Sequence, residues 1–158
     1  MIKISTKGRY GTRLMLNLAR HYNHDEEVVI LKSVSDEEEI SIRYLEQIII
    51  PLKINRLVKS IRGAGGGYLL ARKPSKIKIS EIIQSLEGSF CLVDCIEERD
   101  YCHRTPKCAA HEIWKEASTI LRNYFQSISL QDLVEIYIKK NAKSKKKPDP
   151  RQAKSKKS

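Results

Sequence analysis

The residues best suited to chemistry lie in one short polar stretch, from Cys95 to His111, which holds three thiols and an imidazole. Six residues separate Cys95 from Cys102, five more precede Cys108, and two lie between Cys108 and His111. Loops of this length can bring four soft donors onto one inorganic centre, and thiolate-rich sites select zinc, copper(I) or iron–sulfur clusters over hard cations. The spacing therefore makes Cys95, Cys102, Cys108 and His111 candidate metal ligands.

The spacing alone leaves several kinds of site open. Three cysteines and one histidine suit a tetrahedral zinc ion as well as an iron–sulfur cluster. Zinc sites usually contain two cysteines that are only roughly two to four residues apart, and the wider gaps here favour a cluster. Free thiols that act as a redox switch, or that have no role, are the remaining interpretations. Cys91 lies in an apolar context, which is more typical of a packed thiol than of a ligand.

Length and composition exclude whole classes of protein. The 158 residues suffice for one main domain with appendages, so cysteines are not needed to staple the fold. No apolar run reaches the roughly 18 residues of a membrane span, and no apolar targeting core opens the sequence. We therefore expect a cytoplasmic protein with no membrane partner. In that reducing environment, cysteines are more typical of metal binding or redox chemistry than of disulfides.

The net charge of +11 is unevenly distributed along the chain. Residues 1–80 carry +7, residues 81–138 carry −5, and residues 139–158 carry +9. A basic module joined to an acidic one is typical of a polyanion-binding domain attached to a part with another role. Double-stranded DNA is the expected partner.

The elements before the cysteines predict a helix-turn-helix. Ser5 and Thr6 can cap a first helix, a short helix is expected over residues 31–38, and Ser41 can cap a third helix over residues 42–55. The third helix has a buried stripe and a polar outer face, and Pro51 is expected to bend it. Arginine suits guanine, glutamine suits adenine and glutamate suits the cytosine amino group. The candidate base-reading residues are Ser41, Arg43, Glu46 and Gln47.

A glycine-rich hairpin follows directly and predicts a wing. Two strand-like runs, residues 57–62 and 68–71, flank five residues of which four are glycine. Arg62 can enter a minor groove, while Gly65 and Gly66 let the backbone approach a sugar–phosphate edge. A nucleotide-binding loop is disfavoured, because a strand and not a helix follows the glycines. In the first helix, the basic residues Lys7, Arg9 and Arg13 are candidate phosphate contacts.

The second half of the chain predicts a dimerisation part. Ser80 is expected to cap a short helix that Gly88 ends, and a long helix is expected from Ala109 to about residue 126. The apolar stripe of the long helix needs a partner chain as cover, so we expect a homodimer. A last short helix is expected over residues 131–138. The expected domains are a winged helix-turn-helix (1–80), a cluster-binding loop with dimerisation helices (81–138) and a disordered basic tail (139–158).

Three segments of the sequence are characteristic as a set: KGRYGTRLML, ISIRYLEQIIIPLKINRLVKSIRGAGGGYLLAR and, after the spaced cysteines, HEIWKEAS. Taken together, they resemble the iron–sulfur-cluster-binding winged-helix transcriptional regulators of the IscR and NsrR type, and IscR most closely. The similarity extends from residue 1 to about residue 136. It implies a mainly α fold with a small β-hairpin wing and a long dimerisation helix.

The resemblance also implies a cofactor and a function. By their place in the family's pattern, Cys95, Cys102, Cys108 and His111 would hold a [2Fe–2S] cluster, with one extra residue between the first two cysteines. Nitric-oxide-sensing relatives have an aspartate where this chain has Arg9, which disfavours that type, and His111 in register argues against the cluster-free members of the family. The expected function is a repressor-type DNA-binding regulator that senses cluster supply, iron or redox state. A cluster-free thiol- or metabolite-responsive regulator and a zinc-stabilised regulator are the alternatives. No enzyme motif stands out, so no catalytic residue is expected.

Overall fold

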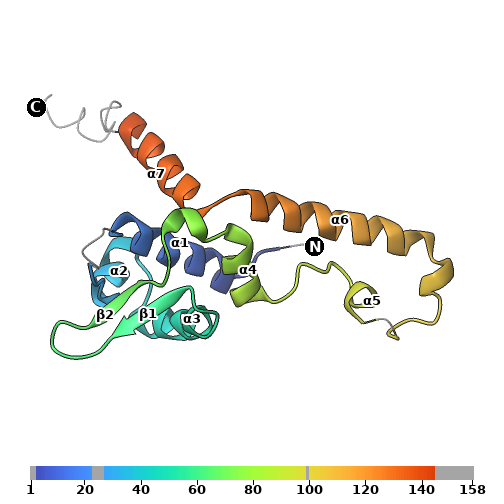
Figure 1. The fold of residues 1–158 in the computed structure, drawn as a ribbon, viewed down its shortest axis with the longest axis horizontal. Coiled ribbons are helices and arrows are strands. Elements are labelled where there is room, and N and C mark those ends of the chain that lie inside the picture. The colour runs from blue at the N-terminus through green and yellow to red at the C-terminus, as the bar shows by residue number, and fades with distance from the viewer. Residues whose placement is uncertain (1–2, 23–26, 99, 145–158) are drawn as a thin grey trace, which may run out of the picture.

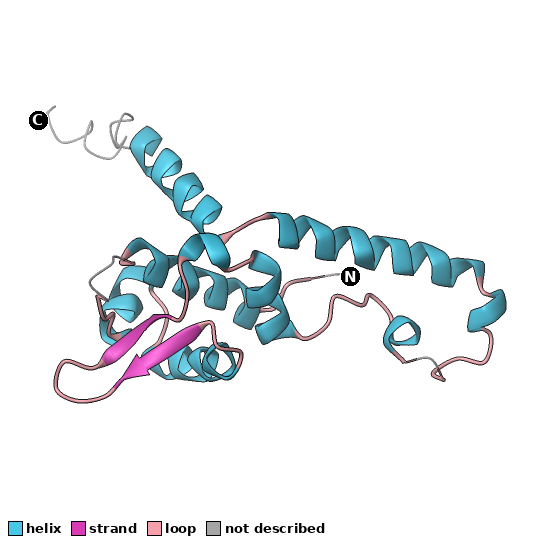
Figure 2. Ribbon diagram, in the orientation of Figure 1, coloured by secondary structure: helices cyan, strands magenta, loops and turns pink. Residues whose placement is uncertain are grey.

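The computed structural model describes residues 3–22, 27–98 and 100–144, and it is mainly helical with one small hairpin (Figures 1 and 2). Along the chain the elements are α1 (Thr6–Arg20), α2 (Leu31–Glu38), α3 (Ile42–Ile54), β1 (Val58–Ile61), β2 (Gly67–Leu70), a 3-10 turn (Pro74–Lys76), α4 (Ile79–Glu87), α5 (Asp94–Glu97), a second 3-10 turn (Thr105–Lys107), α6 (Ala109–Ser127) and α7 (Leu130–Ser144). The expected fold class, a winged helix-turn-helix with a long additional helix, is confirmed. None of the described helices is both long and apolar enough to cross a bilayer.

Apolar side chains at helical spacing form one core between α1, α3 and α4. Leu14 of α1, Leu45 and Ile48 of α3, and Ile82 of α4 are fully buried in it. Removing such side chains from water is the main favourable contribution to folding. Since α4 packs on both α1 and α3, the winged-helix half and the following segment share this core.

The helix-turn-helix forms where the sequence predicts it. Ser5 caps α1, because its Oγ accepts the Gly8 N–H at 3.2 Å. α2 spans the predicted residues 31–38, and the next residue, Glu39, has a φ of 54° that turns the chain toward α3. The helix α3 continues through Pro51 to Ile54, so its end lies within one residue of the predicted one. A proline removes one N–H donor, and here the rest of the helix still forms around it.

The hairpin after α3 is a two-stranded antiparallel wing (Figure 2). Val58 pairs with Leu70 at its base and Ile61 pairs with Gly67 near its tip. The base is anchored in the core, since Val58 and Leu70 are both buried. Residues 62–66 therefore form a loop that extends beyond the paired strands.

The second half of the chain departs from the winged helix along α6, which extends to one side with the cysteine loop and α5 beside it (Figure 1). One prediction for this half is wrong: Ser80 lies inside α4, which begins at Ile79. The start of α4 is fixed instead by Glu81, whose Oε1 accepts the Lys78 N–H at 2.8 Å. The last helix is also longer than predicted, because residues 139–144, expected in the disordered tail, continue α7. The remaining tail, 145–158, lies outside the described residues.

Candidate DNA-binding face and metal-binding loop

The four residues predicted to read bases are all exposed: three lie on one face of α3 and the fourth is its N-cap. Arg43, Glu46 and Gln47 are exposed, and the buried side of the same helix carries Leu45 and Ile48. Ser41 is the N-cap of α3, where its Oγ accepts the Tyr44 N–H at 3.3 Å. The hydroxyl hydrogen of Ser41 is not used in that cap, so it can still be donated to a phosphate or a base edge.

Two further side chains on this face escaped the sequence analysis. Ile50 is 56% exposed and Ile54 is 73% exposed, although both are large apolar residues. They follow Arg43 and Gln47 at helical spacing, so the four residues form one line along α3. The spacing alone places both residues on this face, but isoleucine is so often buried that its residue type does not predict an exposed position.

The first helix supports α3 through a pair of aromatic rings. Tyr10 and Tyr44 make an edge-to-face contact with ring centroids 5.8 Å apart. The guanidinium groups of Arg9 and Arg13 lie 5.6 Å and 5.5 Å from the centre of the Tyr10 ring, within the range of a cation–π contact. Of the other two predicted phosphate contacts, Arg9 is exposed and Lys7 is half-buried. Arg9 lies beside the first turn of α3, because the Tyr10 ring that it contacts packs on Tyr44.

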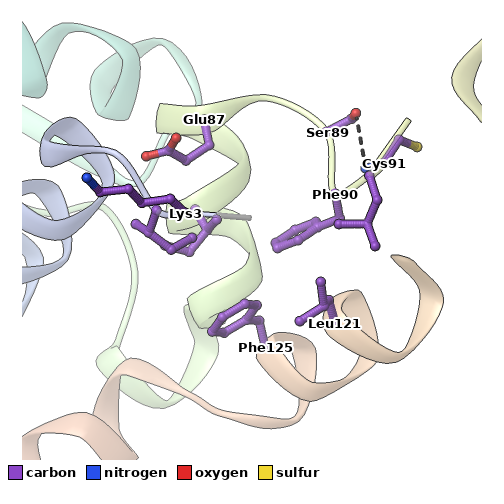
Figure 3. Close-up of a pocket in the computed structure, with 10 residues that line it drawn as sticks. Lys3, Glu87, Ser89, Phe90, Cys91, Leu121 and Phe125 are labelled. Carbon is purple, nitrogen blue, oxygen red and sulfur yellow. Dashed lines mark hydrogen bonds between the residues drawn. The ribbon is translucent and has the colours of Figure 1, made fainter. Parts of the chain in front are cut away.

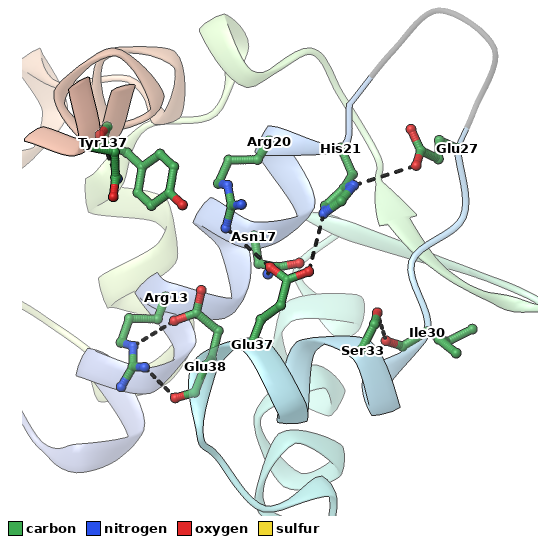
Figure 4. A network of polar contacts seen from close by, with 11 residues as sticks. Arg13, Asn17, Arg20, His21, Glu27, Ile30, Ser33, Glu37, Glu38 and Tyr137 are labelled. Atoms are coloured by element: carbon green, nitrogen blue, oxygen red, sulfur yellow. Dashed lines mark hydrogen bonds and ion pairs between the residues drawn. The ribbon is translucent and has the colours of Figure 1, made fainter. Parts of the chain in front are cut away.

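Arg13, by contrast, is already partnered within the protein. Its Nε lies 2.9 Å from the Glu38 carboxylate, and its Nη2 donates to the Glu38 carbonyl oxygen (Figure 4). This interaction fixes the end of α2 against α1. Arg13 therefore serves the geometry of the helix-turn-helix in this structure.

A second polar contact group ties α1 to α2 and α7 behind the reading face (Figure 4). The carboxylate of Glu37 accepts a hydrogen bond from Asn17 Nδ2 at 3.0 Å and from Arg20 Nη1 at 3.3 Å. The Arg20 guanidinium also lies 4.3 Å from the centre of the Tyr137 ring of α7. Asn17 is 1% exposed, so its bond to Glu37 satisfies a buried donor.

The wing presents Arg62 at the end of β1, and its side chain is exposed. The two glycines predicted to approach DNA differ in their surroundings. A side chain at Gly65 would meet nothing within 4 Å, whereas a Cβ at Gly66 would lie 2.5 Å from the Ile61 carbonyl oxygen. Gly66 is therefore required by the hairpin itself, and Gly65 lies at the open tip.

The structure brings together two of the four predicted metal ligands. Cys95 lies on α5, His111 lies in the first turn of α6, and Cys95 Sγ is 3.6 Å from His111 Nδ1. Cys102 and Cys108 line a common hollow in the intervening loop. All four side chains are half-buried, and each of the cysteines is a free thiol. Among the described residues, no three donors are close enough to form a preformed metal site.

Two contacts hold the cysteine loop in place. Ser118, which is 2% exposed on α6, accepts the Leu92 N–H at 3.1 Å. Within the loop, the hydroxyl of Tyr101 donates to the Asp94 carboxylate, and this bond together with the negative charge of Asp94 raises the pKa of Tyr101. The Ser118 contact keeps the segment before Cys95 close to α6, and the Tyr101 contact joins the loop to α5.

Cys91 lies apart from this loop, in a hollow between α4 and α6 (Figure 3). Phe90 and Phe125 pack there with ring centroids 5.8 Å apart, and Cys91 is half-buried beside them. On the other side of the hollow, the Glu87 carboxylate accepts the Ser5 N–H at 3.2 Å and the Ser5 hydroxyl hydrogen at 2.5 Å. The last residue of α4 thus holds the first turn of α1.

A further hydrogen bond extends this connection to the cysteine loop. Ser89, two residues after Glu87, donates from its Oγ to Glu97 Oε2 at 2.8 Å. Glu97 is the last residue of α5, which carries Cys95. A continuous set of contacts therefore joins the helix that carries Cys95 to the start of α1.

Comparison with known proteins agrees with this architecture. The chain is 37% identical to the HTH-type transcriptional regulator IscR of Photorhabdus laumondii over 133 aligned residues. The aligned region covers 84% of this chain and 79% of that protein. Among solved structures, CymR, the global cysteine regulator of B. subtilis, superposes with a TM-score of 0.71 at 38% identity, covering 86% of this chain and 98% of CymR. IscR of T. potens superposes with a TM-score of 0.67 at 34% identity, covering 96% of both chains.

The family comparison covers most of the sequence. Residues 4–136 match the Rrf2 family, described as iron-dependent transcriptional regulators. The relatives are regulators and not enzymes. The chain therefore belongs to the Rrf2 family of DNA-binding transcriptional regulators.

Proposed function

We propose that this transcriptional regulator changes its DNA binding according to the state of an iron–sulfur cluster, of the [2Fe–2S] type, held by the cysteine loop. The main supporting observation is the contact of Cys95 with His111, which pairs a thiol and an imidazole at the junction of α5 and α6. The identity to IscR of Photorhabdus laumondii supports the same assignment.

The donor set suits such a group. Three half-buried thiols and one imidazole are the ligands that iron–sulfur clusters and zinc take, and carboxylate-preferring cations are disfavoured. Cys95 and His111 would provide one side of the site, while Cys102 and Cys108 would provide the other from the loop. A bound cluster would supply one-electron redox chemistry and would cross-link the loop.

Cluster binding would require the cysteine loop to change its conformation. Because the described thiols do not form a group of three, Cys102 and Cys108 would have to move toward Cys95 when they act as ligands. Such a movement would act on α5, and from there on the Ser89–Glu97 hydrogen bond. Glu87 would pass the change to the first turn of α1.

For the DNA contacts we propose the exposed face of α3 together with the wing. Ser41, Arg43, Glu46 and Gln47 would face base edges in a major groove, and Arg62 would enter the adjacent minor groove. Phosphate contacts would come from Lys7 and Arg9, and from the backbone at Gly65 and Gly66.

A homodimer is proposed on the basis of α6. Along this helix Ile113, Ile120 and Tyr124 are 59–60% exposed, and Trp114 is 43% exposed. Such a stripe on a long helix is stabilised when a second copy covers it. Two copies would place their recognition helices about one DNA turn, ~34 Å, apart on a palindromic site.

The decisive experiment is anaerobic purification of the full chain, followed by an absorption spectrum and assays of iron, sulfide and zinc. We expect visible absorption and about two iron and two sulfide ions per chain. His111→Ala should lose the cluster faster in air than the parent protein, and Cys91→Ser should retain it as a matched control. Colourless, iron-free protein, or equal affinity for DNA with and without the cluster, would contradict the proposal.

A second candidate function is a cluster-free regulator that responds to thiol chemistry or to a metabolite. The similarity to CymR, the global cysteine regulator of B. subtilis, favours it. The common hollow that contains Cys102 and Cys108 is also lined by two positively charged side chains, Arg104 and Lys107. Iron-free protein whose DNA affinity changes on oxidation would support this candidate, and stoichiometric zinc would support a zinc-stabilised regulator.

A further inference from the structure

The exposed isoleucines of α3 are unusual for a recognition helix. Ile48 and Ile49 of the same helix are 0% and 2% exposed, as expected for apolar residues, whereas Ile50 and Ile54 are 56% and 73% exposed. Neither belongs to the core, so the packing of the described chain does not require an isoleucine at either position.

The position of Ile50 connects it to the polar reading residues. One line along the helix contains four exposed residues at successive offsets of four, three and four positions: Arg43, Gln47, Ile50 and Ile54. Ile50 follows Gln47 by one turn. A ligand that contacts the exposed side chain of Gln47 would therefore also lie close to the side chain of Ile50.

The surroundings indicate which ligand this is. A protein partner would need a broad apolar patch, but the residues beside Ile50 include Gln47 and Lys53, which are exposed and polar. Beyond the end of α3, a hollow is lined by Lys53, Arg56 and Lys59, whose positive charges suit a phosphate backbone. Within a major groove, the apolar feature that distinguishes one base from the others is the C5 methyl group of thymine.

We propose that Ile50 contacts the C5 methyl group of a thymine and so determines sequence preference at one position of each half-site. This inference rests on the proposed DNA-binding face. Ile54 lies one turn farther from the N-terminal end of α3, which is the end that commonly reaches the bases in a helix-turn-helix. Its contribution to base reading is therefore expected to be smaller.

The test begins with the full-length chain and a binding site that it selects from random DNA. Each thymine in the selected site is then replaced singly by deoxyuridine, which removes the methyl group and leaves the base pairing intact. We expect one thymine per half-site at which this change weakens binding by about 3- to 10-fold, the size expected for exposing one methyl group.

The same DNA pair is then measured with three variants. Ile50→Ala should bind the thymine site about 3- to 10-fold more weakly and should no longer distinguish thymine from deoxyuridine at that position. Ile50→Val, which keeps branched methyl groups, should retain the distinction. Ile54→Ala is the matched control and should respond to deoxyuridine as the parent chain does.

Several outcomes would overturn the inference. It fails if no deoxyuridine replacement weakens binding, or if Ile50→Ala remains as sensitive as the parent chain. It also fails if Ile50→Ala alters only the oligomeric state in sedimentation, because α3 would then contact a second copy. Failure of the parent chain to select any DNA would instead contradict the proposed DNA-binding face, so the two failures are distinguishable.

Discussion

At the scale of single residues, α3 combines three kinds of chemistry on one exposed face: a cation, a carboxylate and an apolar group. Arg43 provides the positive charge, Glu46 the negative charge and Ile50 the apolar surface. Phosphate attraction is largely independent of sequence, so specificity must come from groups that penalise the wrong base.

Glu46 is the residue whose removal should reveal this penalty. A carboxylate beside DNA accepts from a cytosine amino group and repels sites that lack it. We expect Glu46→Ala to fold normally and to bind a broader set of sequences, with discrimination at one position reduced by roughly 1–3 kcal/mol. Selection from random DNA measures this, with Glu135→Ala on α7 as the control. An unchanged selected sequence would remove Glu46 from the base-reading set.

Substitutions at Gly65 and Gly66 of the wing should have different effects on stability and on DNA binding. A methyl group at Gly66 would lie 2.5 Å from the Ile61 carbonyl oxygen, so Gly66→Ala should lower the free energy of unfolding by about 1–3 kcal/mol. Gly65→Ala meets no atom within 4 Å, so its stability should match the parent protein, while DNA binding weakens. Chemical unfolding and titration with DNA measure the two effects. If Gly65→Ala binds DNA with the same affinity as the parent protein, the wing tip does not contact the DNA backbone closely.

At the scale of elements, the start of α7 is fixed by a reciprocal cap. The Asp132 carboxylate accepts from both the Ser129 N–H and the Ser129 hydroxyl at 2.7 Å, and Ser129 Oγ accepts the Asp132 N–H at 3.2 Å. The hydrogen bonds from Ser129, the largest effect, lower the pKa of Asp132, and the positive charge of Lys78 acts in the same direction.

This cap should make stability depend on acid pH. Because the folded-state pKa is lowered, the stabilisation is present above the unfolded pKa of about 3.9 and is lost as the pH falls through the folded value. Unfolding experiments from pH 6 to about pH 2.5 should therefore show a steeper loss for the parent chain than for Asp132→Asn. Glu135→Gln should follow the parent curve. Parallel curves for the parent chain and Asp132→Asn would show that the cap does not contribute.

Helix boundaries show what local sequence can and cannot predict. Capping by Ser5 and Ser41, and the bounds of α2, follow from residues within one turn of each other, so the sequence sufficed. The start of α4 did not follow, because Ile77–Ile79 pairs in an extended form with the segment around Ser129, some fifty residues away. That long-range pairing keeps Lys78 extended and moves the helix start to Ile79.

The candidate sites also differ in how far local sequence predicts them. The reading face was predictable because residues on one helix share a face by their spacing alone. The pairing of Cys95 with His111 depends on the packing of α5 beside α6, and the Glu87–Ser5 contact joins residues 82 positions apart. The Glu87–Ser5 contact has no local sequence signal. The spacing of the cysteines does indicate that Cys95 and His111 can approach each other, but it does not show which of the four donors meet.

At the scale of the whole molecule, charge and apolar surface are segregated. The winged-helix half is basic, whereas the half that contains the cysteine loop and α6 is acidic and exposes an apolar stripe. A basic half that attracts DNA and a stripe that attracts a second copy can act together only if dimerisation leaves α3 free. Figure 1 shows α6 extending away from α3 and the wing, which satisfies this condition.

A charge placed in the stripe of α6 should therefore separate assembly from folding. Ile120 is 60% exposed, so Ile120→Glu should leave the secondary structure intact while it produces monomers in sedimentation. DNA affinity should fall by at least 10-fold, because one recognition helix is lost from each complex. Gln126→Glu, on the opposite side of α6, is the matched control. Persistence of the dimer in Ile120→Glu would show that another surface joins the copies.

The hydrogen bonds from Ser5 to Glu87 connect the DNA-binding half of the protein to the half that carries the cysteines. The carboxylate lies at the start of α1, which packs on the recognition helix, and it is linked to α5 through Gly88 and the Ser89–Glu97 hydrogen bond. A change in the conformation of α5 would therefore be passed to the start of α1 without any contact with DNA. If the proposed function holds, the protein would respond to the state of its thiols with graded shifts in DNA affinity and not with an all-or-none change.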